Sequence, residues 1–325
     1  MNNENNKEEP LEREKKSDEK VVSLFKKGLV WRPVPTILST TLCLLITGIL
    51  FLLIGIIVLS LSKNIKEFKI RYDNIKECDD ALTSSTSNEC EIPIKLNSTF
   101  KEKVMVYYQL ENFYQNHRRY IKSRSMGQLK GKILSKKQIK DDCDPIITNE
   151  DLGRIYAFDG KTKLDPQEPA NPCGLIAKSF FNDTFTLKKD NKEIPIESKG
   201  IAWEADVKRF KHPENWESIQ WINVTDEKFI VWMRPAGLPT FRKLYGKINM
   251  ELAEGEYKLV IGNNYPVKSF KGKKSFVLST VNSLGGKNNF LGIAYVVVGI
   301  FCLIMSFVFW FGYKRYNTDK KIKLE

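Results

Sequence analysis

TILSTTLCLLITGILFLLIGIIVLSLS, residues Thr36 to Ser62, contains no charged side chain over its whole length. At ~1.5 Å of helix rise per residue, a stretch of roughly 27 residues crosses a ~30 Å hydrocarbon core with some tilt. A cleaved signal peptide is a poorer interpretation, because the mostly polar residues 1–35 precede the stretch and its apolar part is too long. The sequence therefore predicts a retained transmembrane helix.

A second apolar stretch lies near the other end of the chain and gives the protein its predicted organisation. We expect a mostly disordered tail 1–35, a span 36–62, a large domain 63–289, a span 290–313 and a short tail 314–325. Basic residues flank the first span on both sides, so its orientation signal is weak. The basic cluster after the second span favours two cytosolic termini and an extracytosolic domain; it comprises Lys314, Arg315, Lys320, Lys321 and Lys323.

The region between the spans has features of an oxidising, extracytosolic compartment. It carries three N-x-[ST] glycosylation acceptors, at Asn97, Asn182 and Asn223. The two cysteines inside the spans, Cys43 and Cys302, are most simply interpreted as small apolar residues. The other four cysteines fall in the domain: Cys78, Cys90, Cys143 and Cys173. Three pairings into two disulfides are possible, and we expect the sequential one, because it closes two local loops.

Composition and motifs argue against several function classes. The formal charge is +13, from 52 Lys and Arg against 39 Asp and Glu, but the excess is spread over a domain that faces away from nucleic acid. No C-x-x-C pair occurs and neither histidine lies at ligand spacing from a cysteine, so we expect no metal. The sequence contains no G-x-S-x-G, H-E-x-x-H or dinucleotide-binding motif. We therefore expect no catalytic residues and no cofactor.

The large domain has a pattern typical of antiparallel β-structure, in a sheet or sandwich with irregular insertions. Alternating apolar residues predict strands at 103–110, 229–233, 257–261 and 274–280, separated by Pro and Gly turns. Proline at the first position of Pro239 to Ile248 predicts a short helix there. The fold class is thus a membrane protein with two transmembrane α-helices flanking a β-rich, sandwich-like extracytosolic domain, α+β overall.

Both spans carry small residues at a spacing of seven. The first span places Thr41, Gly48, Gly55 and Ser62 on one narrow face, and the second does the same with Gly292, Gly299 and Ser306. Small side chains let membrane helices approach closely, so we expect this helix-packing seam to be buried by protein. It can pair the two spans with each other or with the helices of another protein.

Five long segments carry a resemblance to a known family. They are YYQLENFYQNHRRYIKSRS (107–125), NPCGLIAKSFFNDTF (171–185), GIAWEADVKRF (200–210), FIVWMRPAGLPTFRKLYGKI (229–248) and NYPVKSFKGKKSFVLSTVNSLGGKNNFLGIAYVVVG (264–299). These segments resemble the ligand-effect-modulator or cell-division-control-fifty family, whose members are the accessory (beta) subunits of type-four P-type ATPases that flip phospholipids. The segments occur in the family order between the two spans, and five such motifs in order are far more specific than one short pattern.

The resemblance implies a non-catalytic subunit that forms a heterodimer with a catalytic ATPase subunit. Such a subunit caps the extracytosolic loops of its partner, supports folding and exit from the endoplasmic reticulum, and assists transport of aminophospholipids to the cytosolic leaflet. Its membrane would be the endoplasmic reticulum, the Golgi apparatus and endosomes, or the plasma membrane. By matching position, Asn182 is the family's most typical glycan site, and Cys143 with Cys173 match its second disulfide.

Some positions depart from the family pattern. Members often carry four cysteines in the first cysteine-rich loop, where this chain has only Cys78 and Cys90. Glu204 and Ala205 replace the usual paired aromatic residues after GIAW. Lys321 and Lys323 resemble a dilysine retrieval signal, although chance competes in so basic a tail. The alternative function is a stand-alone glycosylated receptor or adhesin whose domain binds an external ligand.

Overall fold

The computed structural model describes residues 36–83, 88–101, 103–282 and 285–322, with the side chains of 80–83 and 319–322 left out. The expected disordered tail 1–35 and Lys323 of the proposed retrieval signal lie outside this part, and the side chain of Lys321 is among those left out. The described chain divides into a helix pair, up to Leu59 and from Asn289, and a compact domain from Ser60 to Asn288.

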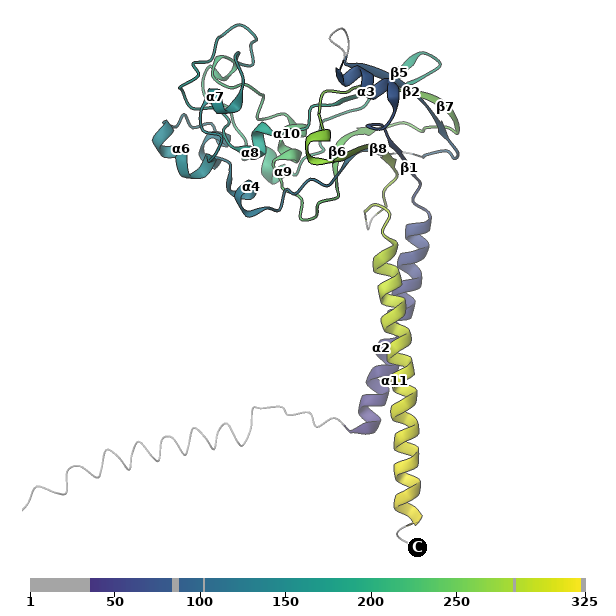
Figure 1. Cartoon of the computed structure of the whole chain (residues 1–325). Helices are drawn as coiled ribbons and strands as arrows, with labels where there is room; N and C mark the ends of the chain where they lie inside the picture. The colour runs from purple at the N-terminus through teal and green to yellow at the C-terminus, as the bar shows by residue number, and fades with distance from the viewer. Residues whose placement is uncertain (1–35, 84–87, 102, 283–284, 323–325) are drawn as a thin grey trace, which may run out of the picture. The chain divides into compact units, whose positions relative to one another are not determined.

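The helix pair consists of α2 (Ile37–Lys63) and α11 (Asn289–Ile322) (Figure 1). Both are long and apolar enough to cross a membrane, over 27 residues in α2 and over the 30 residues Asn289–Thr318 in α11. The helix α11 continues past the expected end at Tyr313. The reason is that no proline or glycine follows within residues 314–322 to interrupt it.

The compact domain contains two four-stranded antiparallel sheets, so the prediction of a β-rich antiparallel domain is confirmed. The first sheet has the order β1 (Glu67–Arg71), β8 (Lys273–Ser279), β3 (Val104–Glu111) and β6 (Phe241–Ile248). The second has the order β2 (Glu89–Leu96), β7 (Gly255–Gly262), β4 (Thr184–Lys189) and β5 (Lys192–Ile194).

Apolar side chains of the two sheets meet in a shared core. The strand β2 alternates strictly between exposed and buried residues, as expected when one face of a sheet is covered. Phe185 of β4 lies with its ring 5.1 Å from that of Phe276 in β8 and 4.9 Å from that of Tyr245 in β6. These edge-on and tilted contacts join the second sheet to the first.

Short helices fill the long connections between strands (Figure 1). The segment between β1 and β2 contains α3 (Lys76–Thr83). The β3–β4 connection contains α4 (Arg118–Lys122), α5 (Met126–Leu129), α6 (Lys136–Cys143), α7 (Asn149–Leu152) and α8 (Leu175–Lys178). The β5–β6 connection contains α9 (Glu204–Val207), the 3-10 helix η1 (Trp216–Ser218) and α10 (Glu227–Trp232), and η2 (Lys268–Phe270) lies between β7 and β8.

Two local predictions were wrong: one predicted helix is a strand, and one predicted strand is a helix. The stretch 239–248 forms β6 and not a helix, because pairing with β3 outweighs the local effect of Pro239. The stretch 229–233 lies mainly in α10 and not in a strand. Its buried residues, Phe229, Ile230, Trp232 and Met233, follow helical spacing, and Asp226 caps the helix by accepting a hydrogen bond from the amide of Lys228 at 3.1 Å.

Candidate functional site

The small residues of the predicted seam lie on the contact face between α2 and α11. A Cβ atom added at Gly48 would lie 2.8 Å from Leu303 Cδ2, and one added at Gly55 would lie 2.7 Å from Val296 Cγ2. On the other helix, Gly299 and Gly292 are equally close to α2, with 3.0 Å to the carbonyl oxygen of Gly48 and 2.7 Å to Leu59. Glycine at these positions lets the two backbones approach.

Polar members of the seam are buried as well. Ser306 Oγ donates a hydrogen bond to the carbonyl oxygen of Thr41 at 3.0 Å, which links α11 to α2. Thr41 in turn donates to the carbonyl of Ile37 at 2.8 Å, within its own helix. Ser62 is buried in the compact domain, where its Oγ accepts from the amide of Asn288 at 3.1 Å. Seam residues therefore have their hydrogen-bonding groups paired, as an apolar surrounding requires.

The four cysteines of the compact domain form two disulfides, Cys78–Cys90 and Cys143–Cys173. The first bridge ties α3 to β2. The second lies in a separate small core with Ile139, Ile146 and Leu152, in the helical connection between β3 and β4. Because that core is small, the bridge is a main constraint on the helical region.

The three glycosylation acceptors differ in their surroundings. Asn97 is exposed in a bend directly after β2, and Asn182 is exposed just before β4. The Asn223 side chain is partly buried, and its Oδ1 accepts hydrogen bonds from the Thr225 amide at 2.9 Å and from the Thr225 hydroxyl at 2.8 Å. His212 Nε2 also lies 3.0 Å from this oxygen.

A buried ion pair joins the two sheets next to Asn182. Lys274 Nζ in β8 lies 2.7 Å from Asp183 Oδ2, with the two side chains 1% and 0% exposed. The same carboxylate accepts from the Tyr72 hydroxyl at 2.7 Å, and from the backbone amides of Asn264 and Tyr265 at 2.6 Å each. Burial lowers the pKa of Lys274, and the Asp183 charge acts in the opposite direction. Each polar atom of the pair thus has partners, which a buried charge needs.

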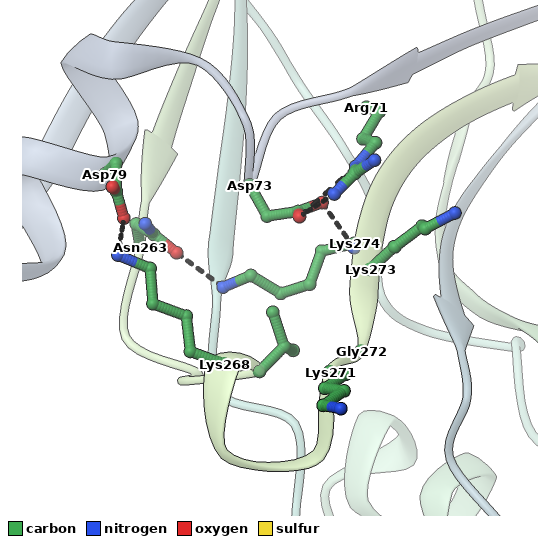
Figure 2. Close-up of a pocket in the computed structure, with 10 residues that line it drawn as sticks. Arg71, Asp73, Asp79, Asn263, Lys268, Lys271, Gly272, Lys273 and Lys274 are labelled. Atoms are coloured by element: carbon green, nitrogen blue, oxygen red, sulfur yellow. Dashed lines mark hydrogen bonds and ion pairs between the residues drawn. The ribbon is translucent and has the colours of Figure 1, made fainter.

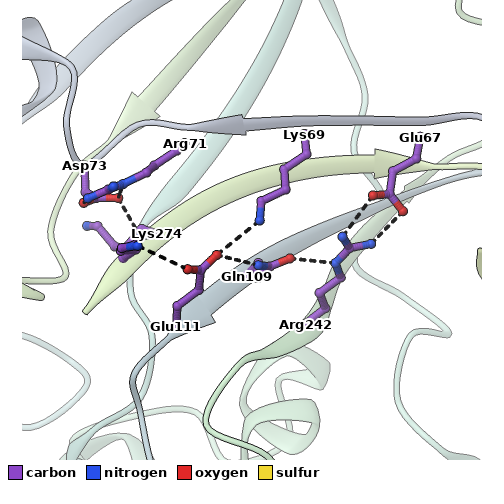
Figure 3. A network of polar contacts seen from close by, with 9 residues as sticks. Glu67, Lys69, Arg71, Asp73, Gln109, Glu111, Arg242 and Lys274 are labelled. Carbon is purple, nitrogen blue, oxygen red and sulfur yellow. Dashed lines mark hydrogen bonds and ion pairs between the residues drawn. The ribbon is translucent and has the colours of Figure 1, made fainter. Parts of the chain in front are cut away.

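Charged side chains of three strands form a network on one face of the first sheet (Figure 3). Arg242 of β6 holds Glu67 of β1 through two bonds, of 2.7 and 3.0 Å. Gln109 accepts from Arg242 at 2.8 Å and donates to Glu111 at 2.8 Å, and Glu111 meets Lys69 at 3.2 Å. The hydrogen bond from Arg242 lowers the pKa of Glu67. The network cross-links the strands and leaves a polar surface.

A basic hollow of 340 Å³ adjoins this network (Figure 2). Its walls carry Arg71, Lys268, Lys271, Lys273 and Lys274 together with two carboxylates. Those carboxylates are already paired: Asp73 with Arg71 at 2.7 Å, and Asp79 with Lys268 at 2.6 Å. Three of the five cations, Arg71, Lys268 and Lys274, are therefore already paired with carboxylates of the chain itself.

Lys243 of β6 is a buried cation that the sequence did not indicate. It is 6% exposed, and its Nζ donates to the backbone carbonyls of Val231 and Trp232 at 3.2 Å each and to that of Arg234. These carbonyls lie at the C-terminal end of α10, where a positive charge is favourable. Burial lowers the pKa of Lys243 to about 7.

Within the described residues, no group of three or more His, Cys, Asp or Glu side chains could hold a metal ion. Local patterns missed the buried lysines and the Asp183 cluster. Asp183 lies 91 residues from Lys274, and Lys243 binds carbonyl groups at the end of α10, a segment whose sequence predicted a strand. One signal could have found Asp183: in the motif FNDTF, alternation places Phe181, Asp183 and Phe185 on one face, and both phenylalanines are buried.

Comparison with known proteins agrees with the architecture. Residues 58–319 match the profile of the LEM3 (ligand-effect modulator 3) family / CDC50 family. The chain is 40% identical to ALA-interacting subunit 3 of Arabidopsis thaliana, over 83% of this chain and 78% of that protein. It is 38% identical to cell cycle control protein 50A of Bos taurus, over 86% of this chain and 84% of that protein.

Proposed function

This chain belongs to the LEM3/CDC50 family, and we propose that it is the non-catalytic accessory subunit of a type-four P-type ATPase that flips phospholipids. The family match carries the proposal, because it covers the whole compact domain, the second candidate span and the last residues of the first span. A relative's name, ALA-interacting subunit 3, describes a protein that acts through a partner. In this proposal the chain forms a heterodimer with the catalytic subunit.

The proposal assigns ATP hydrolysis and lipid transport to the partner. The sequence contains no D-K-T-G motif, which carries the phosphorylated aspartate of P-type ATPases. The accessory subunit would support folding of the partner, its exit from the endoplasmic reticulum and its transport of aminophospholipids to the cytosolic leaflet. Two antiparallel sheets, two disulfides and a buried ion pair cross-link the compact domain, which suits a supporting subunit without catalytic residues.

The orientation follows from the same reasoning. We place both termini in the cytosol and the compact domain outside, in the endoplasmic reticulum, the Golgi apparatus and endosomes, or at the plasma membrane. The two disulfides support an extracytosolic location of the compact domain, because disulfides persist in oxidising compartments. Exposed acceptors at Asn97 and Asn182 support glycosylation, and we propose Asn223 as the third site.

Affinity purification of the tagged full chain in a gentle detergent tests the proposal. The expected result is recovery of a large polytopic ATPase in near-equal amount, identified by mass spectrometry. A tagged membrane protein with two spans of unrelated sequence is the matched control. Recovery of no such ATPase would refute the subunit role and favour the stand-alone receptor.

A further inference from the structure

An exposed apolar surface of the compact domain lies on the hairpin of residues 154–164. Three of its large side chains, Ile155, Tyr156 and Phe158, are 60%, 53% and 48% exposed. The hairpin is closed by an antiparallel bridge between Tyr156 and Lys163. Ala157 is buried, so alternation along the strand places Tyr156 and Phe158 together on the outer face. Exposed apolar side chains that gather in this way mark binding surfaces.

A row of neighbouring rings connects this hairpin to the glycosylation acceptor Asn223. The Phe158 amide donates to the carbonyl of Gln220 at 2.7 Å, and the Phe158 ring lies 4.9 Å from that of Trp216. Trp216 stacks on His212, with the ring centres 3.9 Å apart and an angle of 17° between the planes. His212 Nε2 in turn lies 3.0 Å from Asn223 Oδ1. We call Phe158, Trp216 and His212 the aromatic platform.

The two ends of the Asn223 amide group have different surroundings. Its Oδ1 is held by the backbone amide and the hydroxyl of Thr225, besides its contact with His212. Its Nδ2, the atom to which an N-linked glycan is attached, makes no hydrogen bond with a described residue and is open to solvent. The oxygen and nitrogen of one amide lie ~2.2 Å apart, so Nδ2 lies within roughly 5 Å of His212 Nε2. A sugar attached there therefore starts beside the platform.

The chemistry of the platform fits a sugar. A pyranose ring presents C–H groups on its face, and these pack favourably against the electron-rich face of an aromatic ring. Its hydroxyl groups, which lie around the rim, need polar partners. Asn215 and Glu217 are exposed on either side of Trp216 and can supply them. An apolar peptide or an acyl chain would have no use for these polar groups at the edge of the platform.

We propose that a glycan on Asn223 folds back over the aromatic platform, with its first sugars packed on Trp216 and Phe158. This inference rests on the proposed glycosylation of Asn223. The glycan is the occupant because it is covalently tethered beside the platform, and a short tether raises the local concentration to the millimolar range. Weak contacts are then sufficient to hold it. The glycan covers the apolar surface and does not extend freely into solvent.

Hydroxyl-radical footprinting of the full chain, purified in detergent from eukaryotic cells, tests this cover. The comparison is with Asn223→Asp, which lacks the glycan but keeps a side-chain oxygen to accept from Thr225. We expect Phe158 and Trp216 to be oxidised at least about twofold faster in Asn223→Asp than in the wild type, as measured by mass spectrometry of peptides.

Two controls accompany this comparison. Tyr114 is 57% exposed and lies outside the platform, so its oxidation should be equal in the two proteins. Asn97→Asp removes another acceptor and should leave the oxidation of Phe158 and Trp216 unchanged. Equal oxidation of both rings in the wild type and in Asn223→Asp would overturn the proposal, including the case in which another molecule shields them in both proteins.

Glycopeptides from the same digest separate this inference from the proposal on which it rests. An unmodified Asn223 in the wild type would overturn both the third glycan site and the folded-back glycan. A modified Asn223 with equal oxidation of the rings would overturn only the folded-back glycan. The subunit role is tested separately by purification of the catalytic partner, and none of these outcomes bears on it.

Enzymatic removal of the glycan from the folded chain gives a second test, in which Asn223 is unchanged. A peptide N-glycosidase must reach the bond between Asn223 and the first sugar, and a sugar packed on the platform hinders it. We expect Phe158→Ala to speed release at Asn223 at least about threefold, with release at Asn97 unchanged. Tyr114→Ala is the matched control and should alter neither rate. Equal release at Asn223 in the wild type and in Phe158→Ala would contradict the proposal.

Discussion

Replacing Asp183 by asparagine removes the carboxylate that neutralises Lys274 between the two sheets. The wild-type carboxylate receives four donors: Lys274 Nζ, the Tyr72 hydroxyl and two backbone amides. The asparagine amide group would turn two donor hydrogens toward groups that are themselves donors, and Lys274 would stay buried without its counter-charge. The change keeps the Asn182 acceptor intact, because the middle position of N-x-T tolerates asparagine.

The expected loss is large because the pair is fully buried. Removing one partner of a buried ion pair costs ~3–5 kcal/mol. For a domain of this size, each kcal/mol shifts Tm by ~2–4 °C, so Asp183→Asn should lower Tm on the order of 6–20 °C. Glu91→Gln is the control: its partner Lys258 lies 2.9 Å away, but the two side chains are 50% and 54% exposed. Such a surface pair contributes ~0–1 kcal/mol.

Thermal unfolding of the purified full chains in detergent measures the difference. Adding Lys274→Met to Asp183→Asn should recover part of the lost Tm, because the orphaned buried charge is then removed. A Tm for Asp183→Asn equal to that of Glu91→Gln would refute the role assigned to the pair. A double variant less stable than Asp183→Asn alone would also contradict this reasoning.

Further predictions concern the helix pair, Lys243 and the second disulfide. Gly48→Leu should destabilise the helix pair by ~1–3 kcal/mol, because the new side chain overpacks against Leu303. Gly312→Leu is the control, because there is open space around its Cβ position. Equal Tm values for the two variants would contradict close packing of the helices at Gly48. Burial lowers the Lys243 pKa from 10.5 to about 7, so the unfolded chain binds more protons between these values and stability should rise with pH there. Lys243→Met should flatten that rise in a series of Tm measurements, and an unchanged slope would contradict the assignment. Cys143→Ser removes the bridge to Cys173, 30 residues away in the sequence, and should lower the free energy of unfolding by ~2–5 kcal/mol. Limited proteolysis should then cleave the helical connection between β3 and β4 faster than in the wild type. An unchanged cleavage rate would show that the small core is stable without the bridge.

Features with a local signature could be predicted from the sequence. An uninterrupted apolar run defines α2 without reference to the rest of the chain. Strands β7 and β8 follow from apolar runs bounded by Pro and Gly. The seven-residue spacing of Gly48 and Gly55 predicted a packing face on α2, with either the other span or another protein as its partner, and in the structure this face contacts α11. In each case the pattern repeats within one element, so neighbours in sequence carry the information.

Features that depend on distant partners could not be predicted. Short apolar runs fit either a helix or a strand, and pairing with β3 decided for the strand at Phe241–Ile248. Asp183 and Lys274 are 91 residues apart, and nothing near either residue indicates the other. Likewise, Glu227 lies 25 residues or more from the amides of Gly200, Ile201 and Ala202, from which it accepts hydrogen bonds.

ATP-dependent transport in reconstituted vesicles tests the central claim most directly. The catalytic subunit found by co-purification is reconstituted with and without this chain, and translocation of a fluorescent aminophospholipid is followed after ATP is added. We predict transport only when both subunits are present, and no ATP hydrolysis by this chain alone. Equal transport without this chain, or lipid-stimulated ATP hydrolysis by the chain alone, would contradict the account.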